Sequence, residues 1–200
     1  MSVAKIPPAN ELPSGSLGVG IHWPSMLSEA TNSVANWFEA ASFYTMEKRA
    51  DNIGQNAGYL LLRSLFQTES KPQRINLVGH SFGCKVVLSL LQEVFEDKSE
   101  VKIPRDIAIN VVLLQAACDN NQLEKGDVYG DVAGGISKLR MLVTTSQEDR
   151  ALQIAYPLAG KLNFFRGNNA RAALGAAGPT DEAAQLFGKE KGTFIFMDGN

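Results

Sequence analysis

One serine in this sequence, between two glycines, has the surroundings that covalent chemistry requires. The segment Gly79-His80-Ser81-Phe82-Gly83 follows a short apolar run, and apolar residues at helical spacing begin directly after it. On a sharp strand-to-helix turn a serine hydroxyl projects outward, and the flanking glycines remove the Cβ atoms that would collide across the turn. The N–H of Phe82 at the helix start could stabilise an oxyanion. The pattern predicts a nucleophile at Ser81, and the alternative is a turn without chemistry.

A nucleophilic serine needs a general base, which is most often a histidine. The chain has two histidines, His22 and His80, and neither follows Ser81. His80 is part of the turn itself, so we expect its side chain to point away from the Ser81 hydroxyl. His22 ends a short apolar run and is the better substitute, although packing beside Trp23 is the simpler interpretation.

Two aspartates are candidates for the acid that would orient such a base. Asp149 follows a predicted strand closely enough for its carboxylate to hold an imidazole in the correct tautomer. It could equally favour the dipole of a predicted helix that begins near Ala151. Asp119, after the strand that ends near Gln115, is the second candidate.

The elements that must position these side chains alternate along the chain. Short apolar runs rich in β-branched residues predict strands at 17–21, 75–78, 107–114, 139–145 and 193–197. Apolar residues at three-to-four spacing predict helix within 28–66, at 82–95 and at 151–158. We expect the first helical region to break near 52–58, and the third strand to be buried on both faces.

This alternation predicts an α/β fold: a mostly parallel sheet with helices on both faces, forming a single domain over residues 1–200. In such sheets the functional residues gather where the carboxyl ends of the strands meet the loops. Segments 119–135 and 161–180 are expected to be long connections that could form a lid or a pocket wall. Residues 1–16 are expected to be loop-like.

Composition narrows the class of protein. With 44% hydrophobic residues and a net charge of −2, the chain gives no reason to expect nucleic acid or anionic membrane as a partner. No apolar run reaches the ~20 residues of a membrane span, and no secretory signal is evident, so we expect a cytoplasmic protein. Cys84 and Cys118 are expected to be buried structural thiols, and no metal or cofactor is predicted.

The chain resembles the α/β-hydrolase superfamily, and within it a branch of predicted serine hydrolases. Three motifs carry the resemblance: Trp23-Pro24-Ser25, the elbow Gly79-His80-Ser81-Phe82-Gly83, and Ser146-Gln147-Glu148-Asp149-Arg150-Ala151-Leu152. They occur in the order typical of that branch. The elbow is specific for the superfamily, while the other two motifs are supportive.

The resemblance implies that Ser81 is the nucleophile, Asp149 the triad acid and Phe82 N–H an oxyanion donor, with His80 structural. Some hydrolases of this fold place the acid one strand earlier, which keeps Asp119 open. The family's catalytic histidine belongs after the last strand, and its other oxyanion donor belongs to a His-Gly loop before the Trp-Pro-Ser strand. Neither has a counterpart here. We therefore expect a fragment whose base was encoded beyond Asn200.

The sequence thus predicts a serine hydrolase that attacks an ester-like bond of a small acyl substrate and forms an acyl-enzyme. As this chain alone it is expected to be weak or inactive, because it shows no base. The alternative is a non-catalytic α/β-hydrolase-like module that binds a partner or ligand, since fold alone does not prove activity. A lipase-like effector is a third hypothesis, for which the sequence shows neither a signal nor an exposed apolar helix.

Overall fold

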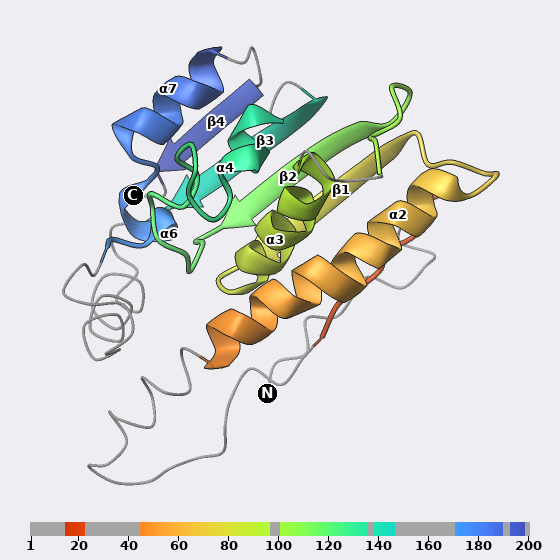
Figure 1. Cartoon of the computed structure of the whole chain (residues 1–200), viewed down its shortest axis with the longest axis horizontal. Helices are drawn as coiled ribbons and strands as arrows, with labels where there is room; N and C mark the ends of the chain where they lie inside the picture. The colour runs from red at the N-terminus through yellow and green to blue at the C-terminus, as the bar shows by residue number, and fades with distance from the viewer. Residues whose placement is uncertain are drawn as a thin grey trace, which may run out of the picture.

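The computed structural model describes residues 15–22, 45–96, 101–135, 138–146, 171–189 and 193–198, without the side chains of 187–189 and 193–198. Four parallel strands form one sheet in the order β1-β2-β3-β4. Their bounds are Arg74–His80, Ala108–Leu114, Leu139–Thr145 and Thr193–Asp198. Because every pairing is parallel, the loops that follow the strands gather at the same end of the sheet, toward which the arrows of β2 and β4 point in Figure 1. The predicted α/β fold is confirmed.

One face of this sheet carries the core. Along each of β1, β2 and β3, buried residues such as Ile75, Val111 and Met141 alternate with residues that are exposed or half-buried. The expectation that the strand at 107–114 is buried on both faces is therefore wrong. The described helices lie on the buried face (Figure 1), and these parts of the chain show helices on that face only.

Helix α3 (Gly83–Phe95) packs its apolar side on β1 and β2, and a long helical segment packs on α3 in turn. This segment comprises residues 45–53, the π-helical turn η2 (Gly54–Gly58) and α2 (Tyr59–Gln67). The predicted break near 52–58 is wrong, because the helix continues through a π turn. A Cβ on Gly54 would overlap the Val86 carbonyl oxygen, so glycine permits this close approach of the two helices.

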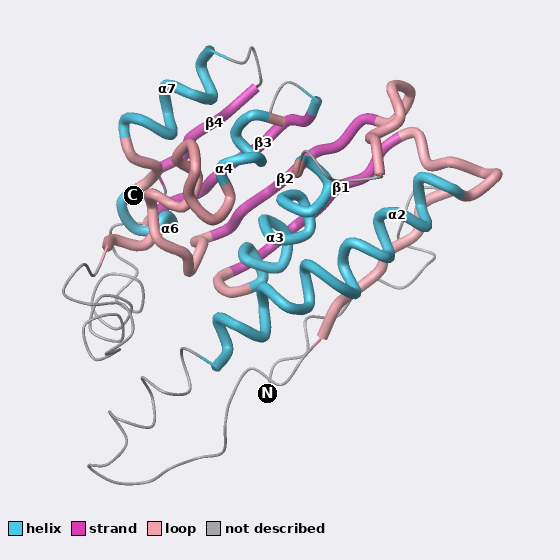
Figure 2. The backbone as a smooth tube through the Cα atoms, in the orientation of Figure 1, coloured by secondary structure: helices cyan, strands magenta, loops and turns pink. Residues whose placement is uncertain are grey.

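The other helices among the described residues are short and lie toward β3 and β4: α4 (Gly130–Gly134), α6 (Leu174–Ala177) and α7 (Asp181–Lys189). Helices α4 and α6 lie within the two predicted long connections, and residues 119–129 of the first connection are drawn as loop in Figure 2. The predicted helix at 151–158 lies outside the described residues. Among the described residues, no helix is long and apolar enough to cross a bilayer.

The predicted strand at 17–21 is wrong. Residues 16–22 have no strand pairing, and Leu17 and Val19 are 82% and 58% exposed. A strand exists only when its backbone groups find a neighbour, and apolar alternation does not supply one.

Candidate functional site

Ser81 stands on the turn between β1 and α3, with a left-handed φ of 54°. Phe82 is the N-cap of α3, and the Cys84 N–H donates to the Ser81 carbonyl oxygen at 3.1 Å. A Cβ on Gly79 would lie 2.7 Å from the backbone of Cys84, so the turn requires glycine there. The predicted strand-to-helix position of Ser81 is confirmed, as is the place of Phe82 at the start of the helix.

The end of β2 holds this turn in place. The Ser81 N–H donates to the Leu114 carbonyl at 3.0 Å, and the Ala117 N–H donates to the Ser81 carbonyl at 3.2 Å. Between these two anchors lies Gln115, which has a φ of 48°. His80 and Leu114, the last residues of β1 and β2, are paired in the parallel register. Ser81 and Gln115 directly follow them and are therefore neighbours.

A third segment, around α6, fastens the loop after β2 to the end of β3. Gly175 N–H donates to the Ala116 carbonyl at 3.0 Å, and the Gly175 carbonyl accepts from Ser146 N–H at 3.0 Å. A Cβ on Gly175 would overlap the backbone of Gln115 and Ala116. Close by, the buried alanines of the loop and of this segment pack with Phe82. The carboxyl ends of β1, β2 and β3 are thereby joined through backbone contacts.

Of the two candidate acids, the structure describes Asp119 but not Asp149. Asp119 is half-buried in the loop after β2 and forms an isolated antiparallel bridge with Ala173, so it belongs to the same edge as Ser81. Asp149 lies outside the described residues, as do Trp23, Pro24 and Ser25. Strand β3 ends at Thr145, four positions before Asp149, on the edge where β1 also ends.

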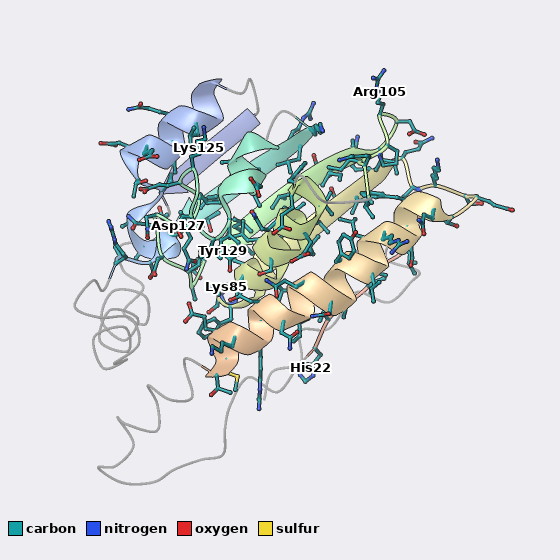
Figure 3. The ribbon with its side chains drawn as sticks, viewed as in Figure 1. His22, Lys85, Arg105, Lys125, Asp127 and Tyr129 are labelled. Carbon is teal, nitrogen blue, oxygen red and sulfur yellow. The ribbon has the colours of Figure 1, made fainter. Side chains whose placement is uncertain are left out.

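Both histidines are exposed. His80 is the last residue of β1, and His22 ends the extended segment 15–22. In Figure 3, His22 lies below the helical segment that contains α2, apart from Lys85 and Tyr129. Within residues 15–22 and 45–96, no hydrogen bond links either imidazole to the Ser81 hydroxyl, so these parts of the chain do not show a base in place.

Both cysteines are free and buried, as predicted. Burial raises the pKa of Cys84 well above its usual range, and the neighbouring Cys118 raises it further. Burial likewise raises the pKa of Cys118 to about 12. Because the thiolate is the reactive form, both groups are inert near neutral pH.

A buried ion cluster, which sequence reasoning missed, lies beside the elbow. Lys85 is 1% exposed, and its Nζ lies 3.2 Å from Glu47 Oε1 and 3.5 Å from Asp51 Oδ2. The Ser89 hydroxyl donates to Asp51 Oδ1 at 2.7 Å, and the Tyr129 hydroxyl donates to the same oxygen. We call these five residues the Lys85 cluster. In Figure 3, Lys85 and Tyr129 lie next to each other.

The Lys85 cluster joins three segments: the helical residues 45–53, α3 and the loop before α4. Lys85 Nζ also lies 5.2 Å from the centre of the Tyr129 ring. Burial, and then the charge of Asp51, raises the pKa of Tyr129 well above its usual range, so its hydroxyl remains a donor. Two signals could have revealed the cluster: a single lysine within a buried helix, and carboxylates four positions apart at Glu47 and Asp51.

One protein-family model matches the sequence of this chain. The model of a family described as "Alpha/beta hydrolase of unknown function (DUF900)" matches residues 4–170. No curated protein and no solved structure matches the chain. Within the ranges that the structure describes, no group of three or more His, Cys, Asp or Glu side chains is arranged to hold a metal ion.

Proposed function

This chain belongs to the alpha/beta hydrolase family that its sequence matches, and on that premise we propose that it is a serine hydrolase. Ser81 Oγ attacks the carbonyl carbon of an ester-like bond in a small acyl substrate, and the alcohol leaves with the proton that Ser81 loses. Water later hydrolyses the acyl-enzyme, which releases the carboxylic acid and restores the Ser81 hydroxyl. The observation that carries this proposal is the left-handed backbone of Ser81 on a strand-to-helix turn. Left-handed backbone at a residue other than glycine is costly and clusters at active sites.

The start of α3 supports an electrostatic role beside this nucleophile. The N-terminal N–H groups of a helix are not used by the helix itself and favour negative charge. The Phe82 N–H is therefore assigned to the oxyanion that forms when Ser81 Oγ attacks. Removing one such donor in a serine protease costs about 10²–10³ in kcat.

Asp149 is assigned as the acid that orients the base, and Asp119 is the second candidate. The family resemblance favours Asp149, and the end of β3 at Thr145 brings the chain to the edge of Ser81 before this residue. Asp119 already lies in the loop whose Ala117 N–H binds the Ser81 carbonyl. Replacing each by asparagine separates them, because the true acid is the one whose loss changes the pH dependence of kcat.

The test is hydrolysis of p-nitrophenyl esters by this chain and by a form extended with its flanking reading frame. Each form is compared with its own Ser81→Ala and His22→Ala variants. We expect little Ser81-dependent turnover in the chain alone, because no histidine follows Ser81 and losing triad members costs on the order of 10⁶ in kcat. Ser81-dependent turnover in the extended form only would show that the base lies outside this chain. Robust turnover by the chain alone that His22→Ala abolishes would make His22 the base. Turnover in neither form refutes the proposal.

The second candidate function is a non-catalytic binding module that uses the same edge of the sheet. It is favoured by one observation: within the residues described, neither His22 nor His80 forms a hydrogen bond to the Ser81 hydroxyl, and both are exposed. A module would bind its ligand equally well after Ser81→Ala and would never become labelled at Ser81 by a fluorophosphonate. We place the protein in the cytoplasm, acting without a cofactor, as part of the same proposal.

A further inference from the structure

Two neighbouring residues at the functional edge share an unusual backbone. Ser81 and Gln115 are the two non-glycine residues with positive φ in the part of the chain that the structure describes. They follow His80 and Leu114, which are paired in the parallel register of β1 and β2. The two left-handed residues are thus held side by side by the hydrogen bond from Ser81 N–H to the Leu114 carbonyl, which is 3.0 Å long.

Glycine is the residue that a φ of 48° favours, because it has no Cβ to oppose the following carbonyl. At Gln115 the backbone conformation is needed for other reasons. It allows Ala117 N–H to reach the Ser81 carbonyl and Gly175 N–H to reach the Ala116 carbonyl. All of these bonds use backbone atoms, so glycine would make them with less strain. The side chain of Gln115 therefore costs stability without contributing to the turn.

No compensating interaction of that side chain is found. The Gln115 N–H donates to Thr144 Oγ1 at 3.3 Å, but within the described ranges its carboxamide forms no hydrogen bond. The residue is half-buried at the carboxyl edge of the sheet. A carboxamide offers two N–H donors, and such donors are used to hold a carbonyl oxygen that gains negative charge. A strained residue with an unused donor beside a nucleophile fits a contact with substrate.

We propose that Gln115 contacts the substrate: its side-chain amide donates a hydrogen bond to the carbonyl oxygen of the acyl group that Ser81 attacks. This inference rests on the proposed function and adds a second donor to the Phe82 N–H. It also defines the substrate more narrowly, as a compound whose reacting carbonyl approaches from the β2 side of Ser81. The bond gains strength as the oxygen becomes negative, so its loss lowers kcat more than it raises KM.

The test uses three variants in whichever form, chain or extended frame, shows Ser81-dependent turnover. Gln115→Gly removes both the strain and the amide. Gln115→Glu keeps the size and replaces the donors with an acceptor. Gln73→Glu is the matched control, because Gln73 directly precedes β1 at the opposite end of the sheet. For each we measure Tm, kcat and KM for a p-nitrophenyl ester, and the rate of Ser81 labelling by a fluorophosphonate.

We expect Gln115→Gly to raise Tm while lowering kcat and the labelling rate by about tenfold or more. Gln115→Glu should lower both rates by a similar factor, and Gln73→Glu should leave them unchanged. Unchanged rates in Gln115→Gly overturn the inference but leave the proposed function intact. A lowered Tm in Gln115→Gly also overturns it, because the side chain would then serve the fold. Absence of Ser81-dependent turnover in both forms removes the proposed function and this inference together.

Discussion

Ser81 of the elbow and Lys85 of the Lys85 cluster lie four residues apart along the chain, yet the polar groups of the two regions differ in their surroundings. Ser81 of the elbow and Gln115 beside it have a left-handed backbone and are half-buried. In the Lys85 cluster the lysine is 1% exposed and lies between two carboxylates, one of which also binds two hydroxyl groups. Strain and unused polar groups mark the first region, and satisfied polar groups mark the second.

This difference separates a site from the structure that supports it. Strain is retained where a residue does something besides folding, whereas a buried charge is retained only when its partners are in place. The Lys85 cluster fixes α3 against two other segments, and α3 begins at the elbow. Variants of the cluster should therefore change the stability of the protein, whereas variants at the elbow should change its chemistry.

The largest effect on stability is expected for Lys85→Met. The substitution leaves Glu47 and Asp51 buried or half-buried without their cation, which costs about 3–5 kcal/mol of unfolding free energy. Chemical denaturation monitored by circular dichroism measures the loss. The matched control is Arg49→Met, which removes an exposed cation from the same helical segment as Glu47. Equal stability of the two variants would show that the Lys85 cluster contributes nothing.

The next effect concerns alkaline pH. Because burial raises the pKa of Cys118 from 9.0 to about 12, the folded state binds this proton more tightly than the unfolded state does. Stability is full below pH 9 and falls between pH 9 and 12, by roughly 4 kcal/mol from this thiol. Denaturation at several pH values measures the slope. In Cys118→Ala the slope should be shallower, and an unchanged slope would contradict the assignment.

A smaller loss is expected for Gly54→Ala. The added methyl group would meet the Val86 carbonyl oxygen and the Ser89 side chain, which lie on α3. Overpacking of this kind costs about 1–3 kcal/mol. The control is Ala57→Gly, an exposed position in the same π turn. If Gly54→Ala is as stable as the parent chain, the close approach of the two helices is not what this glycine serves.

The smallest effect is expected for Tyr129→Phe. It removes one hydrogen bond to Asp51 and keeps the ring that lies near Lys85 Nζ. Because Ser89 still donates to the same carboxylate, the cost is about 1–2 kcal/mol. Thermal unfolding measures it. A loss as large as that of Lys85→Met would mean that the hydroxyl, not the cation, holds the Lys85 cluster together.

Local patterns predicted much of the fold. Strands β1 to β4 were expected within a few residues of their observed bounds, because β-branched apolar runs specify buried strands directly. The elbow was also predictable, since the steric conflict that requires glycine at Gly79 arises with Cys84, only five residues away. The strand expected at 17–21 failed because pairing depends on a distant neighbour.

The candidate site was predictable only in part. Ser81 and Phe82 follow from one local motif, and they lie where the motif placed them. The strain at Gln115 could not be predicted, because the segment at Gly175 that packs on it is distant in the sequence. The Lys85 cluster was missed for the same reason, since Glu47, Lys85 and Tyr129 come together only in the folded chain.

The backbone bonds that join the strand ends have a consequence for how the edge opens. Gly175 bonds to the loop after β2 and to the residue after β3, and Ser81 bonds to Leu114 at the end of β2 and to Ala117 in that loop. Each of these amides donates to a carbonyl of another segment, so exposing one of them requires two segments to separate. Their hydrogens should therefore exchange with solvent at a common rate, as one cooperative unit. The elbow would then open only together with the loops that surround it. Local fluctuations would therefore leave the position of Ser81 relative to these loops unchanged.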